Sequence, residues 1–131
     1  AILSIGHIGN EAEKAVELAK QKGLKPALYD MRFVKPLDEA LLKSLAQTHQ
    51  AFVSVEEHVI AGGAGSALAE ALMRHTIERP LLMLGLPDRF IDHGDHQQLL
   101  ALEGLDSEGI EASILKRFAS LLQPRSPRLI A

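Results

Sequence analysis

Four short apolar runs alternate with stretches of helical periodicity, and this alternation limits the fold more than any other feature of the sequence. The runs lie at residues 1–5, 27–29, 51–55 and 81–84, and each is bounded by glycine, proline or polar residues. Such runs are typical of strands that are buried on both faces of a parallel sheet. The alternation therefore predicts an α/β domain of three layers, α/β/α, built on a doubly wound, mainly parallel sheet with right-handed crossovers.

The stretches between these runs place apolar residues at helical spacing. Ala12, Ala15, Val16 and Ala19 recur at i, i+3, i+4 and i+7, and Gly23 follows as a stop signal, so the first helix is expected to end there. Further helices are expected over residues 38–48 and 65–75 and, in the tail, on either side of Gly104, the last with Ile110, Ile114, Leu115, Phe118, Leu121 and Leu122 on one face.

Length and composition narrow the class of protein. The 131 residues, of which 47% are hydrophobic, suit one domain with one core, expected over 1–122 with a C-terminal tail over 123–131. The net charge of −3 without a basic stripe argues against nucleic acid as a partner, and no apolar run is long enough to cross a membrane. The absence of cysteine excludes disulfides and thiolate chemistry and fits a cytoplasmic protein.

The stretch VEEHVIAGGAGSALAEAL, residues 55–72, has the layout of a strand, a glycine-rich loop and a helix. A helix that starts after such a loop can bind an anion through its free N–H groups. The dinucleotide pattern G-x-G-x-x-G nevertheless fails, because position 68 is leucine, and the Walker pattern fails because the loop has no lysine. We therefore interpret Gly62, Gly63 and Gly65 as residues that permit close helix–sheet packing and shape a contact between domains or subunits.

Two carboxylates and a histidine, Glu56, Glu57 and His58, stand at the carboxyl end of the predicted third strand. Ligands and contacts of open α/β sheets gather at this end of the strands. Neighbouring strand residues point to opposite faces, so the two carboxylates are not expected to act on one substrate as a pair. One is expected to cap a helix, and the other to be solvated or to lie at an interdomain or dimer contact together with His58.

Three further groups of residues could carry chemistry. His93 and His96 in DHGDH could share a helix face as metal ligands, although Gly94 separates them and Asp95 is placed to cap the next helix. His7 ends the first strand without an identifiable acid partner, and we give it no role. In DMRFVKPLDEALL, Arg32 and Lys35 could bind an anion, pair across an interface or simply be solvated.

Three stretches, DMRFVKPLDEALL, VSVEEHVIAGGAGSALAEAL and LGLPDRFIDHG, in this order and spacing resemble the C-terminal domain of the 1-deoxy-D-xylulose-5-phosphate synthase family. The resemblance covers residues 1–122. It implies one domain of a transferase that joins pyruvate to D-glyceraldehyde 3-phosphate, releases CO₂ and supplies isoprenoid, thiamine and pyridoxal synthesis. The enzyme of this family uses thiamine diphosphate and Mg²⁺, and its N-terminal and middle domains carry the cofactor signature and the catalytic residues.

The resemblance assigns no catalytic, cofactor-binding or metal-binding residue to this sequence. It implies an inactive support domain whose partners are the N-terminal and middle domains of its own chain, in a homodimer. The sequence opens within a strand pattern, so we expect a fragment of a longer chain. The family's antiparallel edge strand is expected to precede residue 1, which leaves four parallel strands in the order 2-1-3-4 and the 27–29 strand at an edge.

Two groups of alternatives stay open at this point. Single pieces of the sequence also resemble the C-terminal domains of transketolases and of 2-oxo acid dehydrogenase beta subunits. A free-standing flavodoxin-like module that binds a phosphate ligand, or a metal site on His93 and His96, would give the chain a function of its own. The fold cannot separate these alternatives, because doubly wound folds host many functions.

Overall fold

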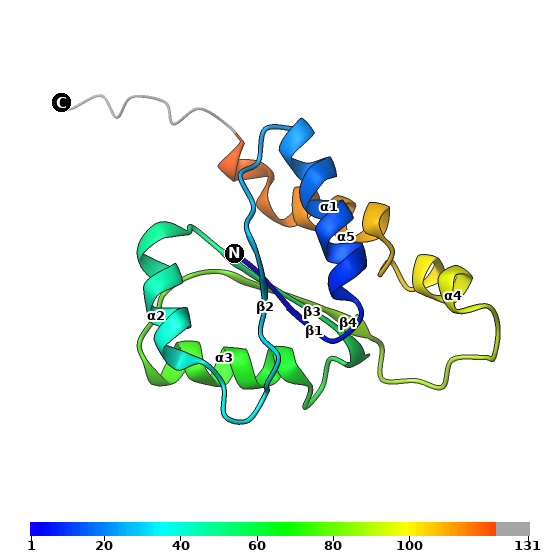
Figure 1. The fold of residues 1–131 in the computed structure, drawn as a ribbon, viewed down its shortest axis with the longest axis horizontal. Helices are drawn as coiled ribbons and strands as arrows, with labels where there is room; N and C mark the ends of the chain where they lie inside the picture. Colours follow the sequence, from blue (N-terminus) through cyan, green and yellow to red (C-terminus); the bar gives the residue numbers. More distant parts are fainter. Residues whose placement is uncertain (123–131) are drawn as a thin grey trace.

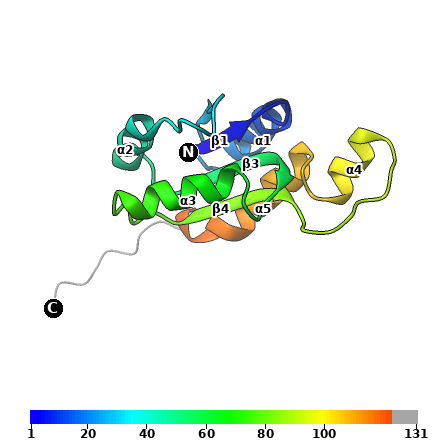
Figure 2. The same cartoon turned by 90° about the horizontal axis from the view of Figure 1, so that it is seen from below.

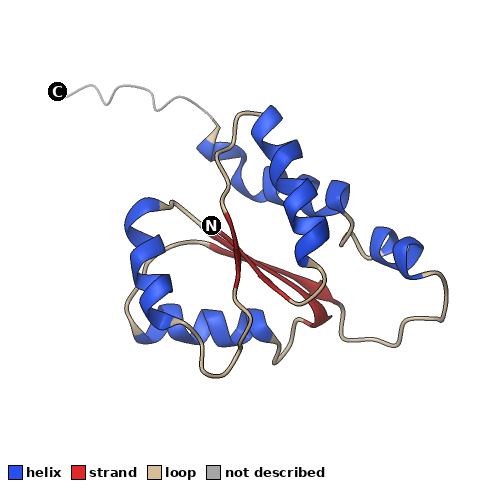
Figure 3. Cartoon of the chain, in the orientation of Figure 1, coloured by secondary structure: helices blue, strands red, loops and turns tan. Residues whose placement is uncertain are grey.

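The computed structural model describes residues 1–122, and the expected tail over 123–131 lies outside the described residues. Strands and helices alternate as the sequence predicts (Figures 1 and 3). The strands are β1 (Ile2–Ile5), β2 (Leu28–Asp30), β3 (Phe52–Val59) and β4 (Leu81–Leu86). The helices are α1 (Gly9–Gln21), α2 (Glu39–Thr48), α3 (Ala64–Arg74), α4 (His96–Leu102) and α5 (Ser107–Phe118), followed by the 3₁₀ turn η1 (Ala119–Leu121).

All four strands are parallel and lie in the order β2-β1-β3-β4, as predicted. The register pairs Ile2 with both Leu28 and Val53. β1 therefore lies inside the sheet, and β2 and β4 are the two outer strands of the described sheet. The first crossover runs from β1 to one outer strand, and the chain later returns to β3 on the other side of β1. The winding reverses between β1 and β3, and open α/β sheets bind ligands at such a reversal point.

The helices form a layer on each face of the sheet (Figure 1). α1 and α5 pack together on one face, where the buried residues include Ala12, Ala15, Val16, Ile110 and Ile114. The alanines of α1 let the helix backbone approach the sheet closely. On the other face, α2 and α3 contribute Leu42, Leu45, Ala46, Leu68, Ala71 and Leu72. Figure 2 shows α4 beyond the carboxyl ends of the strands, outside both layers.

Aspartates start three of the helices. Asp38 accepts a hydrogen bond from the backbone N–H of Leu41 at 2.9 Å, and Asp95 accepts one from Gln98 at 3.1 Å. Both caps confirm the sequence prediction. Asp106 caps α5 in the same way. Gly104, which lies between α4 and α5, has a φ of +70°, a conformation that glycine adopts without strain.

The largest corrections to the sequence prediction concern the end of β3 and the end of the long helix, while β4 continues two residues beyond the predicted run, to Leu86. β3 continues to Val59, four residues beyond the predicted end, because the Glu56–Val59 backbone stays paired with neighbouring strands across an irregularity in register. The long helix ends at Phe118, and the tighter turn η1 follows. The change in pitch moves Leu121 and Leu122 off the buried face, and 39% and 37% of their surfaces are exposed. Within residues 1–122, no helix combines the length and apolar character needed to cross a membrane.

Candidate functional site

An open cleft of about 450 Å³ lies at the carboxyl ends of β1 and β3, where the winding of the sheet reverses. Its lining brings together residues from four segments of the chain. They are Ile5, Gly6 and His7 at the end of β1, Val34 from the loop after β2, Glu56, Glu57 and His58 at the end of β3, and Gly62, Gly63 and Ala64 at the start of α3. The cleft therefore contains all but Gly65 of the six residues that the sequence analysis singled out at the end of the third strand and in the glycine-rich loop.

Glu56 is the most constrained residue of this cleft. Its side chain is buried, and its two carboxylate oxygens accept hydrogen bonds from the backbone N–H groups of Ala64 and Gly65 at 2.7 and 2.9 Å. These N–H groups belong to the first turn of α3 and would otherwise lack partners. A negative charge at this helix end is also favoured by the helix dipole. The chain's own carboxylate thus fills the position that an external anion would take.

The glycines of the loop make this arrangement possible. A Cβ atom on Gly63 would lie 2.6 Å from the carbonyl O of Val59 and closer still to the Glu56 carboxylate. A Cβ on Gly65 would lie 2.6 Å from Oγ of Ser54. Gly62 has a φ of +75° and free space around it, so it serves the turn itself. Gly63 and Gly65 are buried, whereas Gly62 is exposed.

Glu57 and His58 occupy different environments from Glu56. Glu57 is partly exposed, and its Oε1 lies 2.6 Å from Nε2 of His96, at the first residue of α4. His58 is exposed, and its ring nitrogen Nδ1 lies 2.9 Å from the carbonyl O of Val59. Glu56 is therefore the capping carboxylate that the sequence analysis expected, whereas Glu57, expected to be solvated or at a contact between domains or subunits, pairs with His96 within the domain. His96 joins α4 to the end of β3, which the sequence analysis did not foresee.

The remaining sequence candidates do not gather into a site. Among residues 1–122, no group of three or more histidine, cysteine, aspartate or glutamate residues is placed to hold a metal ion, and His96 already pairs with Glu57. His7 is exposed, and its Nδ1 lies 3.3 Å from the side-chain nitrogen Nδ2 of Asn10. Arg32 and Lys35 are exposed on the loop before α2.

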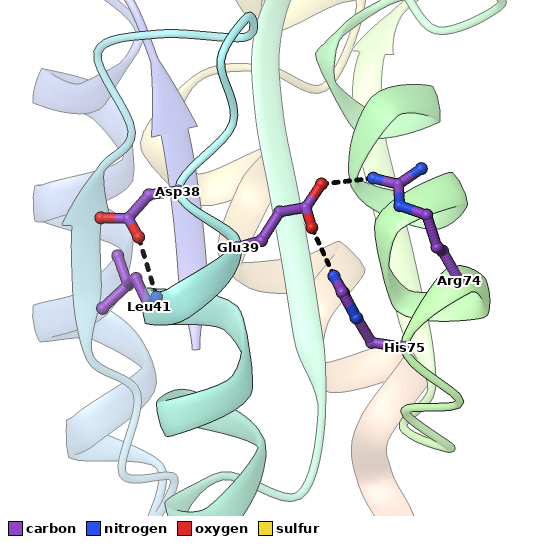
Figure 4. Close-up of polar contacts among 5 residues, drawn as sticks. All are labelled: Asp38, Glu39, Leu41, Arg74 and His75. Atoms are coloured by element: carbon purple, nitrogen blue, oxygen red, sulfur yellow. Dashed lines mark hydrogen bonds and ion pairs between the residues drawn. The ribbon is translucent and has the colours of Figure 1, made fainter.

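A second polar cluster, away from the cleft, joins α2 to α3 (Figure 4). Glu39, at the start of α2, contacts both Arg74 and His75, at the end of α3, through its two carboxylate oxygens. The hydrogen bond with His75, and then that with Arg74, lower the pKa of Glu39 below its ordinary value. The sequence analysis missed this clasp, because its partners lie 35 and 36 residues apart and no local pattern links them.

Comparison with known proteins identifies the family. The sequence pattern of the family described as "Transketolase, C-terminal domain" matches residues 1–110. The chain belongs to the transketolase C-terminal domain family. The solved structure of a protein titled "Split gene transketolase, inactive beta4 tetramer" aligns with a TM-score of 0.79 and 30% identity, covering 93% of this chain and 38% of that one. The resemblance and the fold that it implied are thus confirmed.

Several curated proteins whose sequences are similar to this chain are named 1-deoxy-D-xylulose-5-phosphate synthase. The protein of that name from Paraburkholderia phymatum is 51% identical over 117 residues, which are 89% of this chain and 18% of the relative. The one from Albidiferax ferrireducens is 52% identical over 124 residues, which are 95% of this chain and 19% of the relative. The chain therefore spans less than a fifth of the length of these relatives.

Proposed function

We propose that this chain is the C-terminal support domain of a 1-deoxy-D-xylulose-5-phosphate synthase. Such an enzyme is a transferase that condenses pyruvate with D-glyceraldehyde 3-phosphate and releases CO₂. The observation that carries the proposal is the identity of 51–52% to proteins of that name over nearly the whole chain. The 30% identity to the split-gene transketolase makes the C-terminal domain of a transketolase the second candidate.

The chemistry of this enzyme class depends on thiamine diphosphate and Mg²⁺, and the described residues of this chain do not fit either group. The Glu56 carboxylate occupies the helix end that could receive a diphosphate, and its negative charge would repel one. The part of the chain that the structure describes also has no cluster of three ligands for a divalent ion. We therefore assign no catalytic step to this domain and place the cofactor sites in the rest of the enzyme.

The proposed role is to support the enzyme through contacts at the cleft. Glu57, His58 and Gly62 are the accessible members of the predicted contact, whereas Glu56, Gly63 and Gly65 are buried and fix the shape of the loop. The partners in this proposal are the N-terminal and middle domains of the same chain and a second subunit, in the cytoplasm. We place the domain at residues 1–122 and the tail at 123–131.

A chimeric enzyme tests the proposal. This chain would replace the matching region of the Paraburkholderia phymatum synthase, and the chimera would be assayed with pyruvate, D-glyceraldehyde 3-phosphate, thiamine diphosphate and Mg²⁺. We expect turnover by the chimera and none by the isolated chain. A matched chimera that carries the C-terminal domain of a transketolase, about 30% identical, serves as the control and should be less active.

Two results would overturn the proposal. Turnover, or tight binding of thiamine diphosphate, by the isolated chain would place chemistry in this domain. A chimera that folds and binds the cofactor, but whose turnover is no higher than that of the transketolase control, would contradict the assignment of this chain to the synthase.

A further inference from the structure

A further cleft, of about 370 Å³, opens at the amino edge of the sheet, opposite the candidate functional site. Its base is formed by the amino ends of β1 and β3, at Ile2, Ala51 and Val53. Its walls are the loop 23–26 after α1, residues 48–50 at the end of α2, and the last turns of α5 with η1. The volume falls within the range of about 300–1,000 Å³ that is typical of small-ligand sites. The support role proposed above makes no use of this amino-edge cleft.

Apolar side chains make up much of the walls of the amino-edge cleft. Ile114 and Phe118 of α5 are buried behind it, whereas Leu24 and Pro26 are partly exposed. Leu121, which the change of pitch after α5 moves off the buried face, also lines the cleft and is 39% exposed. A ligand with an apolar body would remove these exposed surfaces from water, and this removal favours binding.

Hydrogen bonds within the domain hold the walls in place. The backbone N–H groups of Gly23 and Leu24 donate to carbonyl groups in the last turn of α1 at 3.1 and 3.2 Å. Figure 1 shows η1, in orange, beside this loop, and a Cβ atom on Gly23 would lie 3.8 Å from Cδ2 of Leu122. Nε and Nη2 of Arg79 donate to the carbonyl O of Ala46 at 3.3 and 3.1 Å and fix the end of α2. A site that is already shaped loses less conformational entropy when it binds a ligand.

The side chains that line the amino-edge cleft carry positive charge, although the whole chain is negative. Lys25 is exposed at the rim and is in no ion pair within residues 1–122, and no acidic residue of that part of the chain lines the cleft. His49 also lines it, and burial lowers the pKa of this histidine below 6.5, so its ring is neutral at pH 7. Lys25 is therefore the charged side chain that a ligand would meet there.

The helix ends near the cleft do not cancel this charge. α1, α2 and α5 all end at this edge, and the carboxyl end of a helix carries partial negative charge. Arg79 binds the last carbonyl groups of α2, and Lys20 stands in the last turn of α1. In α5 the last turn carries Lys116 and Arg117, and Cζ of Arg117 lies 5.3 Å from the centroid of the Phe118 ring. The surroundings of Lys25 thus favour an anionic group.

We propose that the amino-edge cleft binds a medium-chain monocarboxylate, with its hydrocarbon chain against Leu24, Pro26 and Leu121 and its carboxylate paired with Nζ of Lys25. One carboxylate matches one lysine, whereas a phosphate dianion would hold a second charge without a partner beside apolar walls. The inference goes beyond the support role and does not rest on it, because all the residues that it uses belong to this chain.

Titration with octanoate tests the proposal, and 1-octanol serves as the uncharged probe of the same length. Calorimetry at pH 7.5 would measure affinity and stoichiometry, and backbone chemical shifts of the ¹⁵N-labelled chain would locate the site. We expect one octanoate per chain with a Kd below about 1 mM, and 1-octanol binding weaker by at least about fivefold. The largest shift changes should fall within residues 23–26, 48–50 and 114–121.

Two variants separate the charged end of the site from its apolar wall. Lys25→Ala should weaken octanoate binding by at least about fivefold and leave 1-octanol binding unchanged, whereas Leu121→Ser should weaken the binding of both probes. Lys43→Ala on α2 and Leu102→Ser on α4 remove an exposed lysine and an exposed leucine away from the cleft and should change neither affinity. All four side chains are exposed, so the variants should keep the thermal midpoint of the parent.

Three outcomes would overturn the inference. They are the absence of saturable octanoate binding, equal octanoate affinities of the parent and Lys25→Ala, and shift changes that lie outside the amino-edge cleft.

The chimera described above extends the test to a whole enzyme. Ala1 also lines the cleft, and residues of the synthase precede it in the chimera. The chimera should bind octanoate as the isolated chain does, and loss of binding there would show that another segment fills the cleft and would overturn the inference too. Because the assay of the proposed function measures turnover, an active chimera that does not bind octanoate would refute this inference alone.

Discussion

At the scale of single residues, Glu56 makes the most consequential side-chain contact of the site. Its two oxygens satisfy two N–H groups of α3 inside the domain. Glu56→Gln replaces one accepting oxygen with an amide that donates, so one N–H group loses its partner. We expect a loss of about 2–3 kcal/mol in the free energy of unfolding, measured by urea denaturation. Glu57→Gln is the matched control, and its partly exposed pair with His96 should be worth about 1 kcal/mol or less. Equal losses for the two variants would contradict the capping role.

Gly63 gives a second prediction at this scale. Gly63→Val would force side-chain atoms against the Glu56 carboxylate and the Val59 carbonyl. The loop must then move and weaken the cap, at an expected cost of about 2–4 kcal/mol in the free energy of unfolding. Ala61→Val, on an exposed position two residues away, is the control and should have little effect. A Gly63→Val chain with unchanged thermal stability would show that the loop does not need glycine there.

At the scale of secondary structure elements, Glu11 joins α1 to α5. Its carboxylate accepts from Nζ of Lys14 at 2.7 Å and from the backbone N–H of Ser107 at 3.0 Å. The Lys14 hydrogen bond, with the Ser107 hydrogen bond adding to it, lowers the pKa of this buried carboxyl below its ordinary value of 4.5. The lowered pKa means that the contribution to stability is present above about pH 4.5 and is lost as the pH falls through the folded pKa.

Replacement of Glu11 tests this link between helices. Glu11→Gln should destabilise the chain by about 1–2 kcal/mol at pH 7 and by less at pH 3, which lies below the ordinary pKa of 4.5, so the unfolded chain holds the proton and the ionic contribution to stability has declined. Urea midpoints at the two pH values measure the difference. Glu17→Gln breaks an exposed pair with Lys20 on the same helix and should cost about 0.5 kcal/mol or less at either pH. A penalty for Glu11→Gln that does not change with pH would contradict the ionic contribution.

The elements themselves were largely predictable, because their signals are local. Ala12, Ala15, Val16 and Ala19 mark the buried face of α1, and Asp38 marks the start of α2. The sequence predicts the end of β3 four residues too early, because a charged residue such as Glu56 normally marks the end of a buried strand. In the structure the Glu56 carboxylate stays buried because it accepts hydrogen bonds from the backbone of α3. The end of α5 depends on a tertiary change of pitch after Phe118 that apolar periodicity does not reveal.

At the scale of the whole molecule, the topology of the sheet could be predicted, whereas the contacts between residues far apart in the sequence could not. The alternation of strands and helices indicates a parallel, doubly wound sheet, and the order of its four strands was implied by the family resemblance. The pair of Glu57 with His96 and the clasp of Glu39 with Arg74 and His75 depend on how loops and helix ends meet after folding. The candidate cleft could therefore be placed at the end of β3, whereas its link to α4 required the structure.

The response of folding to pH gives a last prediction for the whole chain. Burial lowers the pKa of His49, at the end of α2, below its ordinary value of 6.5. Because the folded pKa lies below the unfolded one, the contribution of the neutral imidazole to stability should be present above pH 6.5 and decline as the pH falls below it. His49→Gln removes this titration, so the variant should lose less stability between pH 8 and pH 5 than the parent does. Urea midpoints at pH 8, 6.5 and 5 for both proteins measure the effect, and identical slopes would show that the imidazole is not desolvated in solution.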